Sequence, residues 1–212
     1  MKQLLVFSAG VLAGLVSTQL YGQAGNTASL KANSNNKKAN HYYLDVHHLG
    51  KVTASDVARA HQKDLSVQKK YGVNILKYWI DEKQGDVYCL ATAASSEDLR
   101  KTHAEAHGLV PDKIFEVTEG EKAKLKGNNK LFLDVHELGA EKVTFQDVQG
   151  AHKKDLAVQK KYGVNLIDYW FDEKTGTVMC LAQAPDSDAL INTHKEAHGL
   201  IPVRVAEVKE KH

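Results

Sequence analysis

The chain contains two copies of one sequence unit, and this internal repeat constrains its fold more than any other feature. Residues 41–117 and 130–208 correspond along their whole length, and "AHQKDLSVQKKYGVN" in the first copy returns as "AHKKDLAVQKKYGVN" in the second. Each copy has fewer than about 80 residues, a length at which one domain buries only a thin core. We therefore expect two small domains of the same fold that pack together as an internal pseudo-dimer.

Each copy is predicted to form strand, helix, strand, strand, helix and strand in that order. In the first copy, residues 42–49 alternate between apolar and polar side chains, which predicts a strand with one buried face. Thr53 has the character of a helix cap, and Gly72 is suited to the left-handed stop that follows a helix. A hairpin and a second helix over about 95–108 come next. This order is typical of the ferredoxin-like fold.

In a ferredoxin-like domain both helices cover one face of an antiparallel sheet, so the other face of each copy would be bare. Two copies can bury these faces by pressing them together or by closing their sheets into a barrel. The predicted fold class is therefore α+β, with two ferredoxin-like βαββαβ repeats packed as a pseudo-dimer like a dimeric α+β barrel. Trp79 and Trp170 recur on the second strand of each copy, where they either fill the core or line a pocket.

The first residues have the pattern of a secretory signal peptide, predicted over residues 1–22. Lys2 supplies the positive start, and residues 4–16 are an apolar run too short to span a bilayer. Cleavage before Gln23 would leave a small residue at the end of the signal. A short membrane anchor is the alternative interpretation. We expect a mature protein in the periplasm or outside the cell, with no stable membrane anchor.

Two polar segments connect the predicted parts. Residues 23–40 form a predicted flexible tether, and residues 118–129 form the linker between the repeats. The formal net charge is only +2, and the lysine-rich pieces lie in linkers where glutamate is mixed in. Nucleic-acid binding requires a concentrated basic face, so we expect no nucleic-acid partner.

Four histidines and one cysteine recur at corresponding positions in the two copies. Imidazole and thiolate groups are the main protein ligands of late transition metals, so this recurrence points first to a metal ion. The recurring residues are His47, His61, Cys89, His103 and His107 in the first copy and His136, His152, Cys180, His194 and His198 in the second.

The first helix of each copy is predicted to bury a histidine and an aspartate together. At about 100° per residue, His61 and Asp64 fall in the middle of the apolar stripe, and His152 and Asp155 repeat the arrangement. A buried carboxylate beside a buried imidazole is costly unless the two are paired or bind a metal. Three interpretations stay open: a metal ligand with a supporting carboxylate, two ligands, or a hydrogen-bonded pair that only stabilises the core.

The second helix and the first strand add further candidates. His103 and His107 are four residues apart, one helical turn, which suits binding of one ion. His107 also lies in the last turn, where a histidine can act as a C-terminal cap. On the first strand, Asp45 and His47 alternate onto the same face.

Cys89 and Cys180 lie in the middle of predicted strands, and three roles are open for them. Each could be a buried thiol, which is common for free cysteine. The two could form a disulfide with each other in an oxidising compartment. Each could also be a thiolate ligand, and the sequence does not rank the last two roles.

The motifs "DVHH", "AH..DL" and "G.V.CL" together make each copy resemble a family of small bacterial nickel-binding, ferredoxin-like proteins catalogued as a domain of unknown function. The resemblance covers nearly all of each repeat. It implies a metal site that draws on His47, His61, Asp64, Cys89, His103 and His107, with His136, His152, Asp155, Cys180, His194 and His198 as their counterparts.

The chain departs from that family in three respects. It is a tandem of two units and carries an export signal, whereas the family members are single cytoplasmic domains. Its paired helix histidines are four residues apart and are followed by Gly-Leu, where the family commonly has a wider spacing.

The sequence therefore predicts an exported protein that binds a divalent late transition metal. Nickel is implied by the resemblance, and Zn2+ and Cu2+ are the alternatives that the ligand types allow. Sequestration or sensing is the predicted role, with two quasi-equivalent sites and no catalysis. One alternative is a barrel around a small-molecule pocket, in which His61, oriented by Asp64, acts as the base of a cofactor-free oxygenase or isomerase-like enzyme. Another is a structural envelope protein.

Overall fold

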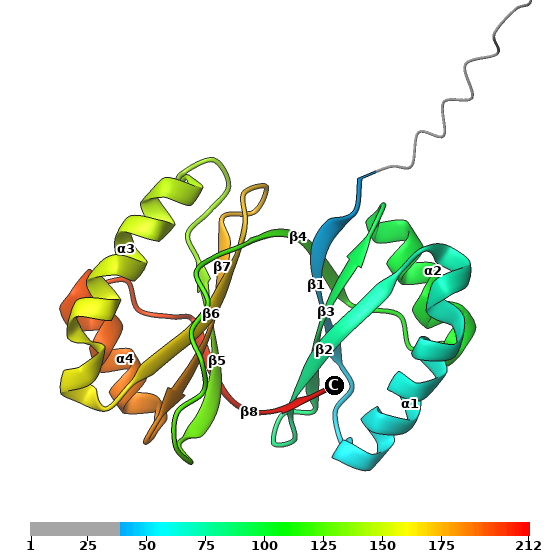
Figure 1. The fold of residues 1–212 in the computed structure, drawn as a ribbon, viewed down its shortest axis with the longest axis horizontal. Helices are drawn as coiled ribbons and strands as arrows, with labels where there is room; N and C mark the ends of the chain where they lie inside the picture. The colour runs from blue at the N-terminus through cyan, green and yellow to red at the C-terminus, as the bar shows by residue number, and fades with distance from the viewer. Residues whose placement is uncertain (1–38) are drawn as a thin grey trace, which may run out of the picture. The chain divides into compact units, whose positions relative to one another are not determined.

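The computed structural model describes residues 39–212, which form a closed eight-stranded barrel with α-helices on its outside (Figure 1). The predicted signal peptide (1–22) lies outside the described residues, as does the predicted tether (23–40) except for its last two residues. None of the helices in residues 39–212 has the length and apolar character needed to cross a membrane.

The first repeat has the predicted βαββαβ order. Thr53 caps the first helix: its side chain accepts a hydrogen bond from the backbone N–H of Asp56, and the Asp56 carboxylate accepts one from the N–H of Thr53. Gly72, with a φ of 67°, ends the helical segment in the left-handed conformation. The elements are β1 (His41–His48), α1 (Ala54–Val67), the 3-10 helix η1 (Gln68–Tyr71), β2 (Asn74–Asp81), β3 (Asp86–Ala93), α2 (Ser96–Ala106) and β4 (Lys113–Glu119).

The second repeat has the same order and the same local signals. Thr144 forms the equivalent capping box with Asp147, and Gly163 ends the helical segment with a φ of 68°. The elements are β5 (Lys130–Glu137), α3 (Phe145–Val158), the 3-10 helix η2 (Gln159–Tyr162), β6 (Asn165–Asp172), β7 (Thr177–Ala184), α4 (Ser187–Ala197) and β8 (Arg204–Lys211).

The barrel closes because the last strand of each repeat pairs with the other repeat. The strand order is β1-β3-β2-β8-β5-β7-β6-β4. Strand β4 pairs with β1 of its own repeat and with β6 of the second, while β8 pairs with β5 and β2. Closure leaves no open sheet edge between the repeats. Of the two predicted ways to bury the bare faces, the chain uses the barrel.

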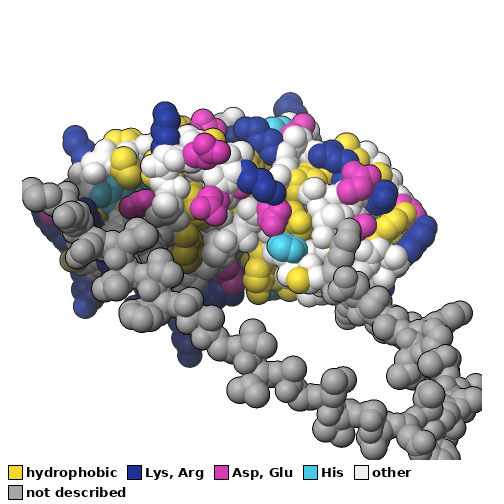
Figure 2. Space-filling model, turned by 90° about the horizontal axis from the view of Figure 1, so that it is seen from above, with side chains coloured by type: hydrophobic (Ala, Val, Ile, Leu, Met, Phe, Trp, Pro, Cys, Tyr) yellow, Lys and Arg dark blue, Asp and Glu magenta, His cyan; other side chains and the backbone are white. Residues whose placement is uncertain are grey.

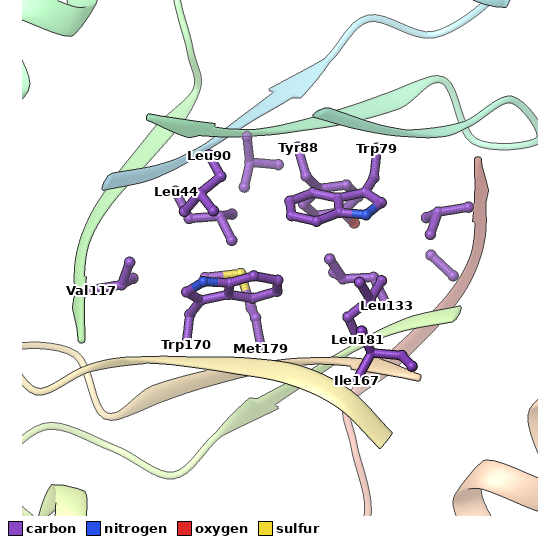
Figure 3. Packing of buried hydrophobic residues seen from close by; sticks show 13 residues of the cluster. Leu44, Trp79, Tyr88, Leu90, Val117, Leu133, Ile167, Trp170, Met179 and Leu181 are labelled. Carbon is purple, nitrogen blue, oxygen red and sulfur yellow. The ribbon is translucent and has the colours of Figure 1, made fainter. Parts of the chain in front are cut away.

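Apolar side chains from both repeats fill the barrel interior (Figure 3). Trp79 and Trp170 are fully buried there, and their ring centroids are 5.1 Å apart. They are therefore core residues, one of the two roles predicted for them. Burying a large apolar side chain stabilises the fold by about 1.5–3 kcal/mol. The interior cluster consists of Leu44, Val46, Trp79, Tyr88, Leu90, Val117, Leu133, Ile167, Trp170, Met179, Leu181, Ala206 and Val208.

The helices form an outer layer: α1 and α2 cover the sheet of the first repeat, and α3 and α4 cover that of the second (Figure 1). Strand β1 shows how this layer is built. Leu44 and Val46 point into the barrel, whereas Asp45 and His47, on the opposite face, contact the helices. The polar side chains of β1 therefore lie between sheet and helices, outside the barrel. At the surface, side chains of both charges are mixed on the described part of the face in Figure 2.

Candidate metal centre

Strand β1 contributes the most deeply buried carboxylate of the first repeat. Asp45 is 0% exposed, and its Oδ1 lies 3.1 Å from Nε2 of His47, which is also buried. The alternation of "LDVH" brings both side chains onto the helix-facing side of the sheet. The sequence placed Asp45 on this face but did not rank it among the candidate ligands. The alternation that identified His47 was the signal that could have identified it too.

His103 on α2 connects this strand to helix α1. Its ring is 1% exposed, and both ring nitrogens face carboxylates. Nδ1 lies 3.0 Å from Oδ1 of Asp64, and Nε2 lies 3.3 Å from Oδ2 of Asp45. One imidazole thus joins two carboxylates that come from different elements.

His107 completes the hydrogen-bond chain at the end of α2. It is the C-cap residue, as one interpretation of the sequence predicted. Its Nδ1 accepts a hydrogen bond of 3.1 Å from the backbone N–H of Leu109, so in the neutral ring the proton is on Nε2. Nε2 then donates to Oδ2 of Asp64 at 3.1 Å. Asp64 therefore accepts hydrogen bonds from both helix histidines.

The charges in this cluster shift the pKa values of its members. Burial alone lowers the pKa of His103, but the hydrogen bonds and charges of Asp45 and Asp64 outweigh burial and raise it to about 10. Burial raises the pKa of Asp45, yet its close contacts with the rings of His103 and His47 lower it to about 2. At neutral pH the cluster is therefore a histidinium held between two ionised carboxylates.

Cys89 lies beside this cluster on β3, paired in register with Asp45 of β1. Burial and the charges of Asp45 and Asp64 raise the pKa of its thiol well above the ordinary value. Cys89 and Cys180 are both free, and they belong to different repeats. The disulfide between them, one of three roles left open by the sequence, is therefore wrong.

His61 and His152, which the sequence placed among the first candidates, lie apart from the closest groups of ligand atoms. Each is buried, and each packs on a tyrosine ring, His61 on Tyr78 and His152 on Tyr169, with centroids 4.6 Å apart in both cases. Desolvation lowers the pKa of both histidines. Asp64 is hydrogen-bonded by His103 and His107 instead of His61, so the structure does not form the His61–Asp64 pair that was one of the three interpretations left open.

The second repeat reproduces the geometry of the first. Nδ1 of His194 is 3.0 Å from Asp155, and its Nε2 is 3.3 Å from Asp134. His136 Nε2 lies 3.1 Å from Asp134, and His198 Nε2 lies 3.2 Å from Asp155. The pairing of carboxylates and imidazoles is therefore a property of the repeated unit.

Within residues 39–212, groups of three potential metal ligands converge in both repeats. In each group the ligand atoms lie within 4.8 Å of one another. The groups are Asp45, His47 and Cys89; Asp64, His103 and His107; Asp134, His136 and His194; and Asp155, His194 and His198.

The two groups that contain Asp45 and Asp134 also have buried polar atoms that make no hydrogen bond. Oδ1 of Asp45 and Oδ1 of Asp134 each lie 3.1 Å from a histidine Nε2 but without hydrogen-bond geometry, and Nδ1 of His47 has no hydrogen-bond partner among the described residues. A buried carboxylate oxygen without a partner is costly, and a bound cation would remove that cost. Carboxylate, imidazole and thiol donors together suit a late transition metal, so the residues present fit such an ion.

Residues 43–117 and 132–208 both match one family model, described as nickel responsive protein SCO4226-like. The chain belongs to this family. The solved structure of SCO4226 from Streptomyces coelicolor A3(2) is 32% identical, and the match covers 36% of this chain and 93% of that chain, with a TM-score of 0.35. Since the family model matches each repeat separately, the resemblance inferred from the motifs is confirmed.

Less similar structures match over both repeats. A putative monooxygenase from Lactobacillus acidophilus NCFM is 12% identical over 81% of this chain and 93% of that chain, with a TM-score of 0.46. A mutant chlorite dismutase from Candidatus Nitrospira defluvii is 5% identical over 81% of this chain and 90% of that chain, with a TM-score of 0.45. At such values neither supports a statement about function. No curated protein matches the sequence.

Proposed function

We propose that this member of a nickel-responsive family binds a divalent transition metal, nickel first, with one ion in each repeat. The observation that carries the proposal is that His47 and Cys89 converge on the buried carboxylate of Asp45, whose Oδ1 makes no hydrogen bond within residues 39–212. In the second repeat a similar group converges on Asp134, with His136 and His194 as its other members, which makes a chance cluster a poor explanation.

In the first repeat, four side chains would hold the ion: Asp45, His47, Cys89 and Nε2 of His103. The first three already form one close group, and Nε2 of His103 faces the same carboxylate. A bound cation favours the deprotonated forms of Cys89 and His103 Nε2, which reverses the protonation preferred by the metal-free cluster. Metal affinity should therefore rise with pH.

Asp64 and His107 would support the ligands without binding the ion themselves. Asp64 accepts the Nδ1–H of His103 and so directs Nε2 towards Asp45, which is the role carboxylates take behind metal-bound histidines. Coordination through Nε2 of His107 would move the ring proton to Nδ1, where it would face the N–H of Leu109. Because two donors would then oppose each other, the loop conformation argues against His107 as a ligand.

Sequestration or sensing suits this site better than turnover. Its proposed ligands are almost completely buried in both repeats, which favours retention of an ion over rapid exchange. The alternative of a catalytic cavity inside the barrel has no support from the barrel interior, which side chains of both repeats fill. His61 and Asp64, the base and orienting residue of that alternative, lie outside the barrel beneath the helices.

Export to the periplasm or the medium remains part of the proposal, and it rests on the predicted signal peptide alone. Expression of the full chain in a bacterial host, followed by fractionation and mass determination, tests it. We expect a mature chain beginning near Gln23 outside the cytoplasm. A full-length chain retained in the cytoplasm would contradict the expectation.

Metal analysis of the purified chain without an affinity tag, followed by calorimetric titration of nickel, zinc and copper into the stripped protein, tests the central proposal. We expect one tightly bound ion per repeat and loss of both in the double variant His103→Gln/His194→Gln. The matched control is His41→Gln/His212→Gln, which changes two exposed histidines. Equal metal binding by both variants would show that the buried clusters do not bind the ion.

A further inference from the structure

A cavity lies directly beside the proposed ligands of the first repeat, between α1, the sheet and the loop after α2. Its volume is about 80 Å³. Since about 10–15 Å³ of such space accommodates one water molecule, the cavity has room for about five to eight water-sized groups. Most of its wall is apolar, and Val52, Val57, Ala60 and Leu109 contribute to it.

His61 is a buried polar side chain of this wall that the metal centre does not use; Asp56, which also lines the cavity, already forms the exposed capping box with Thr53. His61 is 6% exposed, and no hydrogen bond joins it to another residue between 39 and 212. Its ring rests on Tyr78, which lines the same cavity. A buried imidazole normally has a hydrogen-bond partner, so the ring nitrogens of His61 are available to a molecule bound in the cavity.

The surroundings define what kind of ligand this would be. The ligands Asp45 and Cys89 would balance the charge of a divalent cation, and Asp64 and Asp56 add two further carboxylates to the cavity wall, which disfavours an anion. His47 and Cys89 line the cavity from the sheet, His103 from α2 and His61 from α1. A ligand that spans them needs a lone pair at one end, a hydrogen-bond donor at the other and an apolar body between. A neutral five-membered azole has these features and fits the available space.

We propose that the cavity of the first repeat binds a small neutral azole, with one nitrogen towards the metal centre and its N–H donated to His61. The proposal rests on the proposed function, because the first nitrogen is expected to occupy an open position on the bound ion. It gives His61 a role in binding the azole and not the metal, and it defines the chemical class of the molecule that enters the cavity.

The second repeat provides an internal control. Its equivalent cavity measures about 40 Å³, half that of the first. Phe145 occupies the position that corresponds to Ala54 and stacks on Tyr169, with ring centroids 6.2 Å apart. His152 keeps the position of His61, but the space beside it is too small for five ring atoms. Azole binding should therefore occur in the first repeat only.

The test is a titration of the nickel-loaded chain with imidazole at about pH 8, followed by the ligand-field spectrum and by calorimetry, with nickel content measured before and after. We expect one imidazole to bind per chain while the nickel content stays constant. His61→Phe preserves the ring and removes the hydrogen bond, so it should weaken binding about tenfold. Ala60→Leu fills the cavity and should abolish binding, whereas Ala151→Leu and His152→Phe in the second repeat should have no effect.

Four other results of these titrations would contradict the proposal, each for a different reason. Equal imidazole binding by the Ala60→Leu variant would place the ligand elsewhere and overturn it. Loss of nickel from His61→Phe would make His61 a metal ligand, which also overturns it. Acetate binding as tightly as imidazole would contradict the neutral class. If the unaltered chain binds no nickel at all, the proposed function fails first, and the metal analysis shows this before any imidazole is added.

Discussion

The two repeats agree in the polar clusters beneath their helices and differ at the strands where the repeats meet. In the helix-covered layer, the distances from His103 to its two carboxylates equal those from His194 to its own, 3.0 and 3.3 Å. At the junctions between the repeats, by contrast, Lys77 on β2 corresponds to Asp168 on β6. A fused pseudo-dimer frees the two copies to diverge at their junctions, while each repeat keeps its own polar cluster.

The different residues at the junctions give the two tryptophans different partners. Nε1 of Trp79 donates to Glu210 at 2.9 Å, and Lys77 lies 3.6 Å from the same carboxylate. In the second repeat, Nε1 of Trp170 has no hydrogen-bond partner within residues 39–212. Glu119, which corresponds to Glu210 and pairs with Trp170 in register, forms an ion pair with Lys122. The tryptophan N–H is therefore hydrogen-bonded at one junction and has no partner among the described residues at the other.

Asp168 is the clearest consequence of this difference. It is buried, and burial together with the charge of Glu119 raises its pKa to about 7. Lys77, at the same position in the first repeat, is part of an ion pair instead. The two junctions thus respond differently to pH, although the strands that form them pair in the same way.

The largest expected effect separates the two metal centres from each other. Asp45→Asn should remove one ion per chain, and Asp134→Asn should remove the other, because each carboxylate is the centre of its own ligand group. Metal analysis of the single and double variants measures this. If either single variant lost both ions, the two sites would not be independent, and the comparison between equivalent centres would fail.

The second effect is a pH dependence that belongs to one repeat. Because the folded pKa of Asp168 lies above its unfolded value, its contribution favours folding below about pH 4 and is lost as the pH rises towards about 7. Asp168→Asn should therefore be more stable than the unaltered chain at about pH 8 and equal to it at about pH 4. Denaturant unfolding at both pH values measures the difference.

The matched control for this prediction is Glu173→Gln, a change to an exposed carboxylate on the turn after β6. It should leave the difference between the two pH values unchanged. Asp168→Asn with the same pH dependence as the unaltered chain would show that Asp168 is not the buried acid.

The third effect distinguishes the two tryptophans. Trp79→Phe loses the hydrogen bond to Glu210, whereas Trp170→Phe removes an N–H group that has no partner among the described residues. The free energy of unfolding should fall by about 1–2 kcal/mol more for Trp79→Phe than for Trp170→Phe. Urea unfolding of both variants provides the measurement, and equal losses would contradict the assigned difference.

The smallest effect should be the same in both repeats. Thr53→Ala and Thr144→Ala each remove a helix cap in an exposed capping box and should lower the free energy of unfolding by about 1 kcal/mol. The same unfolding experiment applies. A difference between them larger than about 0.5 kcal/mol would mean that the helix-covered layers are less alike than their geometry indicates.

Much of the fold followed from local patterns. The capping residue Thr53, the stop at Gly72 and the alternation of β1 each act over a few neighbouring residues, and the structure confirms each of them. The repeat itself implied a pseudo-dimer, and the barrel confirms it. The site was predicted as a set of residue types, because the buried faces of the helices and strands could be read from their periodicity.

Which carboxylate meets which imidazole could not be predicted in the same way. His61 and Asp64 share a helix face, yet Asp64 is bonded to His103, 39 residues away in the chain, and His103 reaches Asp45 across 58 residues. These contacts depend on how α1 and α2 pack on β1, and helical periodicity says nothing about that packing. Because of this packing, Asp45 lies at the centre of the polar cluster and His61 lines the adjacent cavity.

The sequence by itself determined the repeated unit, the order of its elements, their ends and the side chains that each element buries, because short-range backbone and side-chain preferences govern all of these. Only the tertiary structure decided that the barrel closes through β4 and β8, that both cysteines stay free and that an aspartate lies at the centre of each cluster. Those outcomes depend on contacts between distant segments, whose energies exist only once the elements have packed.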